Sequence, residues 1–128
     1  MNKPTSSYIP GVCNIGPAER RMRRAWGIFG ISTGIILLVY FVVVDAEWAW
    51  RFFLLAPFTA GALCLLQDAF HFCTAFGLRG IYNVVNSTGV TDNVELEAYR
   101  RKDVRKALLI AGLALLVGAF LTGISLLI

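Results

Sequence analysis

Three long apolar stretches, separated by short polar segments, dominate the pattern along this chain. They cover residues 25–44, 52–70 and 107–128, and only the second contains a charged residue, Asp68. As α-helices with a rise of about 1.5 Å per residue, all three match the hydrocarbon thickness of a bilayer, about 30 Å. The pattern therefore predicts an all-α membrane protein with three transmembrane helices.

The polar residues between the stretches indicate where helices begin and where the chain turns. Gly16 and Pro17 suit the N-cap and the first position of a helix that begins before the first apolar stretch. Residues 45–51 include two tryptophans, which suit a membrane interface, and this segment must reverse the chain. Asp92 or Thr91 can cap the last helix, and Asp92 and Glu95 have the spacing of a capping box, so we expect that helix to begin there.

The second stretch is expected to end in polar residues at the membrane surface. A central Asp68 would cost about 2.5–3.5 kcal/mol of insertion free energy, so we place it at the boundary. There we expect Asp68 to form a structural ion pair with Arg20 or Arg24 and to hold the first two helices together. Beyond it, we expect a short amphipathic interfacial segment with a bend near Gly77 or Gly80.

These boundaries divide the chain into four parts. They are an irregular arm (1–16), a two-helix membrane hairpin (17–82), a loop (83–91) and a basic helix that continues into the third span (92–128). Of the 12 Lys and Arg residues, all except Arg51 fall on one side of the three spans. The positive-inside rule therefore predicts a cytoplasmic N-terminus and loop, with the C-terminus outside.

Small residues recur at helical spacing in all three stretches and would allow helices to pack closely. They are Gly27, Gly30 and Gly34 in the first stretch, Ala56 and Ala60 in the second, and Ala111, Ala114 and Gly118 in the third. The glycines leave two alternatives open. They form either a seam between two copies of the chain or a packing face for another helix of the same chain.

The composition supports a membrane protein and argues against nucleic-acid binding. Hydrophobic residues make up 57% of the chain, with a mean hydropathy of +0.66, above the level of about 45–50% that is usual for globular proteins. The net charge of +4 could indicate nucleic-acid binding in a soluble protein. Here the lipid bilayer is a sufficient partner for the basic residues, and we expect no nucleic acid.

Two cysteines and the single histidine are predicted to meet at the cytoplasmic boundary. Cys13, His71 and Cys73, with Asp68 nearby, are a possible ligand set for zinc or a similar ion. Alternatively, Cys13 and Cys73 form a reversible dithiol, helped by neighbouring arginines that favour the thiolate. The structural alternative is that the cysteines are simply buried and that Asp68 or the backbone satisfies His71.

Motifs typical of enzymes are missing from the sequence. It contains no Gly-rich phosphate loop, no Ser/His/Asp set for nucleophilic catalysis and no ladder of acidic residues through the apolar stretches. We therefore expect no enzymatic activity and no cofactor.

Two short segments resemble the signatures of the YgaP-like inner-membrane domain family. The run from Asn14 to Arg20 (Asn-Ile-Gly-Pro-Ala-Glu-Arg) resembles its Asn-x-Gly-x-x-(Asp/Glu)-Arg signature, and the Phe72-Cys73 pair resembles part of its Gly-Phe-Cys-Pro signature. His71 stands where the family has glycine, Thr74 stands where it has proline, and the third span is additional. The resemblance covers residues 13–82. It implies a bacterial inner-membrane two-helix module of poorly defined function, sometimes fused to a rhodanese sulfur-transfer domain.

Together these features favour a small, non-catalytic integral membrane protein of the bacterial inner membrane. We expect it to be a helper subunit of a membrane-protein partner or a homo-oligomeric packing module. One alternative is a cytoplasmic-face thiol or metal site linked to sulfur handling. Another is a small transporter, for which Pro57 and the oligomer-prone faces are the supporting features.

Overall fold

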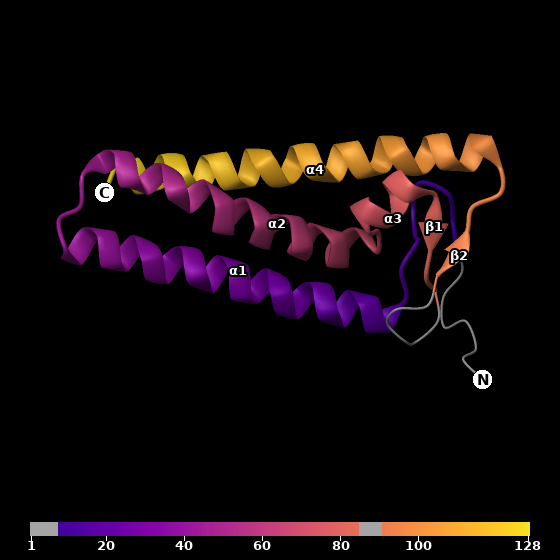
Figure 1. Ribbon diagram of the computed structural model, residues 1–128, viewed down its shortest axis with the longest axis horizontal. Helices are drawn as coiled ribbons and strands as arrows, with labels where there is room; N and C mark the ends of the chain where they lie inside the picture. Colours follow the sequence, from indigo (N-terminus) through magenta and orange to yellow (C-terminus); the bar gives the residue numbers. More distant parts are fainter. Residues whose placement is uncertain (1–7, 85–90) are drawn as a thin grey trace.

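Three long helices lie side by side in the structure, a computed structural model that describes residues 8–84 and 91–128. Helix α2 (Leu55–Phe70) lies between α1 (Pro17–Val43) and α4 (Glu97–Leu126) (Figure 1). With the preceding 3₁₀ helix η1 (Trp48–Leu54), α2 forms one of three helical segments that are long and apolar enough to cross a membrane. The predicted fold class, an all-α protein with three candidate transmembrane helices, is confirmed.

The first helix begins where the sequence predicts. Gly16 is the N-cap of α1 in an extended conformation, and Pro17 occupies the first helical position, where its missing N–H costs no hydrogen bond. At about 1.5 Å per residue, the 27 residues of α1 are about 40 Å long, more than the apolar core of a bilayer requires. The additional turns at its start carry the polar contacts described below.

The connection between α1 and α2 differs from the prediction. After α1 the chain reverses at Asp45, which has a positive φ of 53°. It then forms the 3₁₀ helix η1, so α-helical geometry begins only at Leu55 rather than at Phe52. Pro57 follows two residues later. Pro57 therefore lies in the first turn of α2, just after the change from 3₁₀ to α geometry, and a proline is tolerated in the first turn of an α-helix.

The glycines of α1 pack against α2 of the same chain. A Cβ added at Gly30 would lie 2.8 Å from the Cα of Gly61, and one at Gly34 would lie 2.5 Å from the ring of Phe58. Gly27 faces Leu65 at 2.6 Å in the same way. Of the two alternatives left by the sequence, the structure contains the intramolecular seam, and no free Gly30/Gly34 face remains for a second copy.

Helix α4 packs on α2, α3 and the N-terminal segment through a regular face of buried residues. They recur every three or four positions: Asp103, Ala107, Ile110, Ala114, Gly118, Thr122 and Ser125. At the far end of this face the Arg51 Nη1 donates a 2.7 Å hydrogen bond to the carbonyl oxygen of Ser125. That contact satisfies an acceptor at the negative end of the α4 dipole.

Three small residues that we expected in packing faces are exposed within this chain. They are Ala56, Ala60 and Ala111. Helix α2 instead buries Phe58, Gly61 and Ala62, because the Phe58 ring fills the space beside Gly34. On α4, Ala111 follows the fully buried Ile110 and is rotated about 100° away from it around the helix axis.

The bend after α2 lies earlier than predicted. Helix α2 ends at Phe70, and His71 takes a left-handed conformation with φ 57° and ψ 36°. Helix α3 (Thr74–Arg79) follows and ends at Gly80, which is also left-handed. The early bend allows Phe72, which is 0% exposed, to pack between Gly77 and the α4 residues Ala107 and Ile110.

A small antiparallel sheet was not foreseen. Strand β1 (Ile81–Tyr82) pairs with β2 (Asp92–Asn93), and α4 begins only at Glu97 with Leu96 as its N-cap. The predicted capping box at Asp92 is therefore wrong, because the backbone of Asp92 belongs to a strand. The predicted loop at 83–91 lies partly outside the described residues, which omit 85–90.

The N-terminal arm is packed where the structure describes it, although we expected it to be irregular. Ile9 and Cys13 close a tight turn through backbone hydrogen bonds of 2.9 Å. Ile15, only 1% exposed, forms a parallel bridge with Asn83. Residues 1–7 of the predicted arm lie outside the described part of the chain.

Candidate functional site

A cluster of buried polar groups lies at the end of the bundle where α1 and α4 begin and α2 ends. Its centre is Asn14, which is 0% exposed. The Asn14 Oδ1 accepts from the amide of Cys73 at 2.6 Å, and the Asn14 Nδ2 donates to the carbonyl oxygen of Cys73 at 3.1 Å. The backbone of Asn14 donates to His71 and accepts from Asn83. The Asn14 side chain thus joins the N-terminal segment to the break after α2, and the Asn14 backbone joins this segment to Asn83, the residue that follows β1.

The same cluster includes a buried ion pair from α1. Glu19 is 2% exposed, and its Oε2 lies 3.3 Å from Arg23 Nη1. Glu19 Oε1 accepts from Asn83 Nδ2 at 3.3 Å, while Arg23 Nη2 donates to the Sγ of Cys73 at 2.9 Å. Asn14, Glu19, Arg23, Cys73 and Asn83 therefore form one connected network, called the polar junction below. Removing one partner from a buried pair of this kind costs about 3–5 kcal/mol, since it strands the other charge.

A second ion pair lies next to the polar junction. Asp68 Oδ1 is 3.2 Å from Arg20 Nε, and Asp68 Oδ2 is 2.8 Å from Arg24 Nε. The Arg20 Nε also donates to the Asp68 backbone oxygen at 3.1 Å. Arg24 is half exposed, so water screens its contribution more than that of Arg20. The two residues that the sequence placed opposite Asp68 both contact it and tie α1 to the last turn of α2.

Asp103 anchors the N-terminal segment on α4, and sequence analysis did not single it out. It is 0% exposed. Its Oδ2 accepts from the hydroxyl of Tyr8 at 2.6 Å, and its Oδ1 accepts from the amide of Gly11 at 2.7 Å. The Tyr8 ring stacks on Tyr82 with 4.4 Å between centroids. Burial, followed by the hydrogen bond and the charge of Asp103, raises the pKa of Tyr8 above its ordinary value, so the hydroxyl keeps its proton and donates.

The three candidate thiol and metal residues do not assemble into a ligand set. Cys13 is buried, and its Sγ donates to the carbonyl oxygen of Ile15 at 3.5 Å. Cys73 is buried beside Arg23, whereas His71 is exposed at the end of α2. Both cysteines are free thiols. Within residues 8–84 and 91–128, no group of three or more His, Cys, Asp or Glu side chains is arranged to hold a metal ion.

The sequence contains at most a weak signal for Asp103 and Asn83, two polar residues of this region that it did not identify as important. Asp103 is the one acid within the basic run 100–106, and it lies four residues before Ala107, in register with the packing face of α4. Asn83 gives no such signal, because a polar residue before a loop is ordinary. Its role depends on a strand pairing that the sequence does not predict.

Comparison with known proteins finds no relative. The sequence matches no protein-family model, no curated protein and no solved structure.

Proposed function

We propose that this chain is a non-catalytic helper subunit that packs against another polypeptide in the bacterial inner membrane. The observation that carries the proposal is a second small-residue face on α4, formed by Gly112, Ala119 and Gly123. A Cβ added at Gly112 or Gly123 would have nothing within 4 Å, and Ala119 is exposed. Their spacing of seven and four residues places them on one side of the helix. Such a face lets another transmembrane helix approach closely.

The glycines of α1 pack against α2 of the same chain, which argues against a homo-oligomer built on them. The partner is therefore proposed to be a different polypeptide. Gly30 and Gly34 already contact Gly61 and Phe58 of the same chain. The only Gly-x-x-x-Gly pair in the chain is therefore occupied. The α4 face, in contrast, is open within the described residues and suited to close packing.

The polar junction supports a structural role over a catalytic one. Asn14 uses both side-chain atoms and both backbone groups in contacts with its own chain. Arg23 contacts Glu19 and Cys73. Groups that satisfy one another in this way fix a fold and are poorly placed to bind a substrate.

The assignment to the YgaP-like family is part of the proposal. Its support is that the two resembling segments meet, because Asn14 from the first binds the backbone of Cys73 from the second. In the family's terms, α1 and α2 would be the two-helix module and α4 an addition that anchors the arm through Asp103. The concentration of basic residues at this end supports a cytoplasmic N-terminus, with Arg51 at the outer end.

Native mass spectrometry of the protein, extracted in mild detergent with its endogenous neighbours, tests the helper role. We expect the wild-type chain to carry one other polypeptide at fixed stoichiometry. Gly112→Leu should abolish that complex, because the added side chain separates the helices. Ala25→Leu is the matched control, since Ala25 is exposed on α1, and it should retain the complex. A monomer or a pure homo-oligomer in the wild-type sample would contradict the proposal.

A cytoplasmic-face thiol function is the second candidate, favoured by one contact. The Arg23 Nη2 donates to the Cys73 sulfur at 2.9 Å, so a guanidinium lies directly beside a buried free thiol. Under this alternative Cys73→Ser removes function in cells while the partner complex stays intact. Under the helper role, the same variant keeps function as long as the complex assembles.

A further inference from the structure

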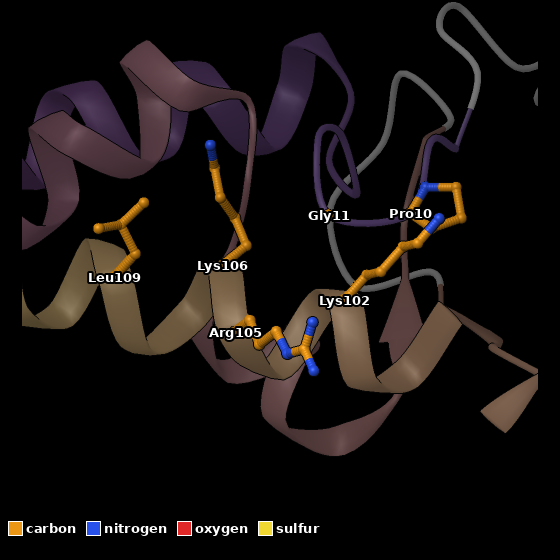
Figure 2. A pocket seen from close by; sticks show the side chains of 6 residues that line it. All are labelled: Pro10, Gly11, Lys102, Arg105, Lys106 and Leu109. Atoms are coloured by element: carbon orange, nitrogen blue, oxygen red, sulfur yellow. The ribbon is translucent and has the colours of Figure 1, made fainter. Parts of the chain in front are cut away.

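A pocket with a basic lining lies between the N-terminal turn and the first turns of α4 (Figure 2). It has a volume of about 350 Å³. In Figure 2 the cationic side chains come from neighbouring turns of α4, and Lys102 extends along Pro10. This basic pocket is lined by Pro10, Gly11, Lys102, Arg105, Lys106 and Leu109.

The cations of the basic pocket have no carboxylate partner among the residues that the structure describes. Within the described ranges 8–84 and 91–128, none of Lys102, Arg105 and Lys106 forms a salt bridge with a carboxylate. Asp103, in the same turn of α4, is 0% exposed, and its two oxygens accept from Tyr8 and Gly11 instead. The positive charge of the pocket is therefore available to an anion from solution or from the membrane.

The wall of the basic pocket that faces α4 is the N-terminal turn at Gly11, and hydrogen bonds hold this turn in place. Gly11 has a positive φ of 71°, and a Cβ there would lie 3.3 Å from the Cβ of Lys102. The Asp103 carboxylate fixes the Gly11 amide, and the Ile9–Cys13 bridge closes the turn. Because the turn is tied on both sides, the pocket exists before any ligand arrives, which lowers the entropy lost on binding.

The location of the basic pocket indicates what the anion is attached to. Its last lining residue, Leu109, belongs to the uncharged stretch 107–128 that is apolar enough to enter a membrane. Lys106 lies over the Phe70 ring, 4.5 Å from its centroid, at the end of α2. Ile9 and Val12, at 47% and 53% exposure, point apolar surface outward from the same turn. A phosphate bound by the cations would therefore have acyl chains beside Leu109.

We propose that the basic pocket binds the phosphate headgroup of an anionic membrane phospholipid. Lys102, Arg105 and Lys106 neutralise the phosphate, and Leu109 contacts the start of the acyl chains. The proposal does not depend on the helper role, and the pocket adjoins the partner face, because Arg105 and Leu109 lie on the same side of α4 as Gly112.

The test measures lipid binding to the purified full chain by native mass spectrometry. The probes are phosphatidylglycerol and phosphatidylcholine in detergent, each titrated alone and then against inorganic phosphate. We expect phosphatidylglycerol to bind at one site per chain. The double variant Lys102→Gln/Arg105→Gln should weaken it about thirtyfold, as expected for two cations at a membrane surface. Arg79→Gln/Arg101→Gln removes the same charge outside the pocket lining and should change affinity less than about threefold.

Three outcomes would overturn the proposal. Equal losses in the two double variants would mean that the protein attracts anionic lipid through diffuse charge. Binding of inorganic phosphate as tight as that of phosphatidylglycerol would identify a free anion as the ligand. Equal binding of phosphatidylcholine would mean that headgroup charge is not recognised. Circular dichroism of each variant verifies that its helices are retained, and Lys102→Arg should keep lipid binding.

Discussion

Replacing Asn14 with alanine tests whether the polar junction holds the fold together. The substitution removes the acceptor at 2.6 Å from the Cys73 amide and the donor at 3.1 Å from the Cys73 carbonyl. Cys73 is 1% exposed, so water does not replace either bond without opening the structure. The Cys73 carbonyl still accepts from the Gly77 amide at 2.9 Å, so the substitution leaves only the Cys73 amide unpaired. A backbone group left unpaired in a buried site costs about 1–3 kcal/mol, and we therefore expect Asn14→Ala to lower the free energy of unfolding by about that amount.

The assay is equilibrium unfolding in mixed micelles, followed by circular dichroism as the denaturing detergent fraction increases. Asn93→Ala is the matched control, because it deletes the same atoms from an exposed asparagine in β2 and should change stability by less than about 0.5 kcal/mol. Wild-type and both variants must unfold in a single transition for the free energies to be compared. If Asn14→Ala unfolds within about 0.5 kcal/mol of Asn93→Ala, the central role given to Asn14 is wrong.

Three further changes test other contacts by the same unfolding measurement. Gly61→Ala should cost about 1–3 kcal/mol because its methyl group meets α1, whereas Gly112→Ala, facing open space, should not destabilise; equal effects would contradict the α1–α2 seam. Tyr8→Phe should cost about 1.5–3 kcal/mol by removing the hydrogen bond to Asp103. Since the pKa of Tyr8 is raised in the fold, its contribution is full below the ordinary value of 10.0 and is lost as pH rises further, so the difference from Tyr8→Phe must shrink at high pH. Asp68→Asn should destabilise less than Asn14→Ala, because one of its two arginine partners is half exposed; an unchanged midpoint would contradict the ion pair.

The sequence predicts the helices because their causes are local. Apolar length identifies the three spans, and Pro17 after Gly16 marks the start of α1. The cost of a central charge places Asp68 at an end, where the arginines of α1 are within reach. Each of these inferences needs only neighbouring residues and the dimensions of a bilayer.

The features that the sequence did not predict depend on contacts between distant segments. Helix α2 stops at His71 because Phe72 is buried against α4, a partner that local periodicity does not identify. The face of α2 that packs is set by Phe58 filling the space at Gly34, so Ala56 and Ala60 stay exposed although their spacing is ideal. In the sequence, Asp103 is only one acidic residue among basic ones. Its role becomes evident only in the fold, where Tyr8 and Gly11 donate hydrogen bonds to it.

The anchoring of Tyr8 by Asp103 also sets an order for biosynthesis. The two residues are 95 positions apart, so the ribosome completes α1 and α2 long before it reaches Asp103. During that time Asn14 can already bind Cys73, but the segment from Tyr8 to Gly11 has no acceptor for its two donors. Helix α4, the last helix to be synthesised, therefore completes the folding of the first described residues. A nascent chain stalled before α4 would expose that segment to proteases.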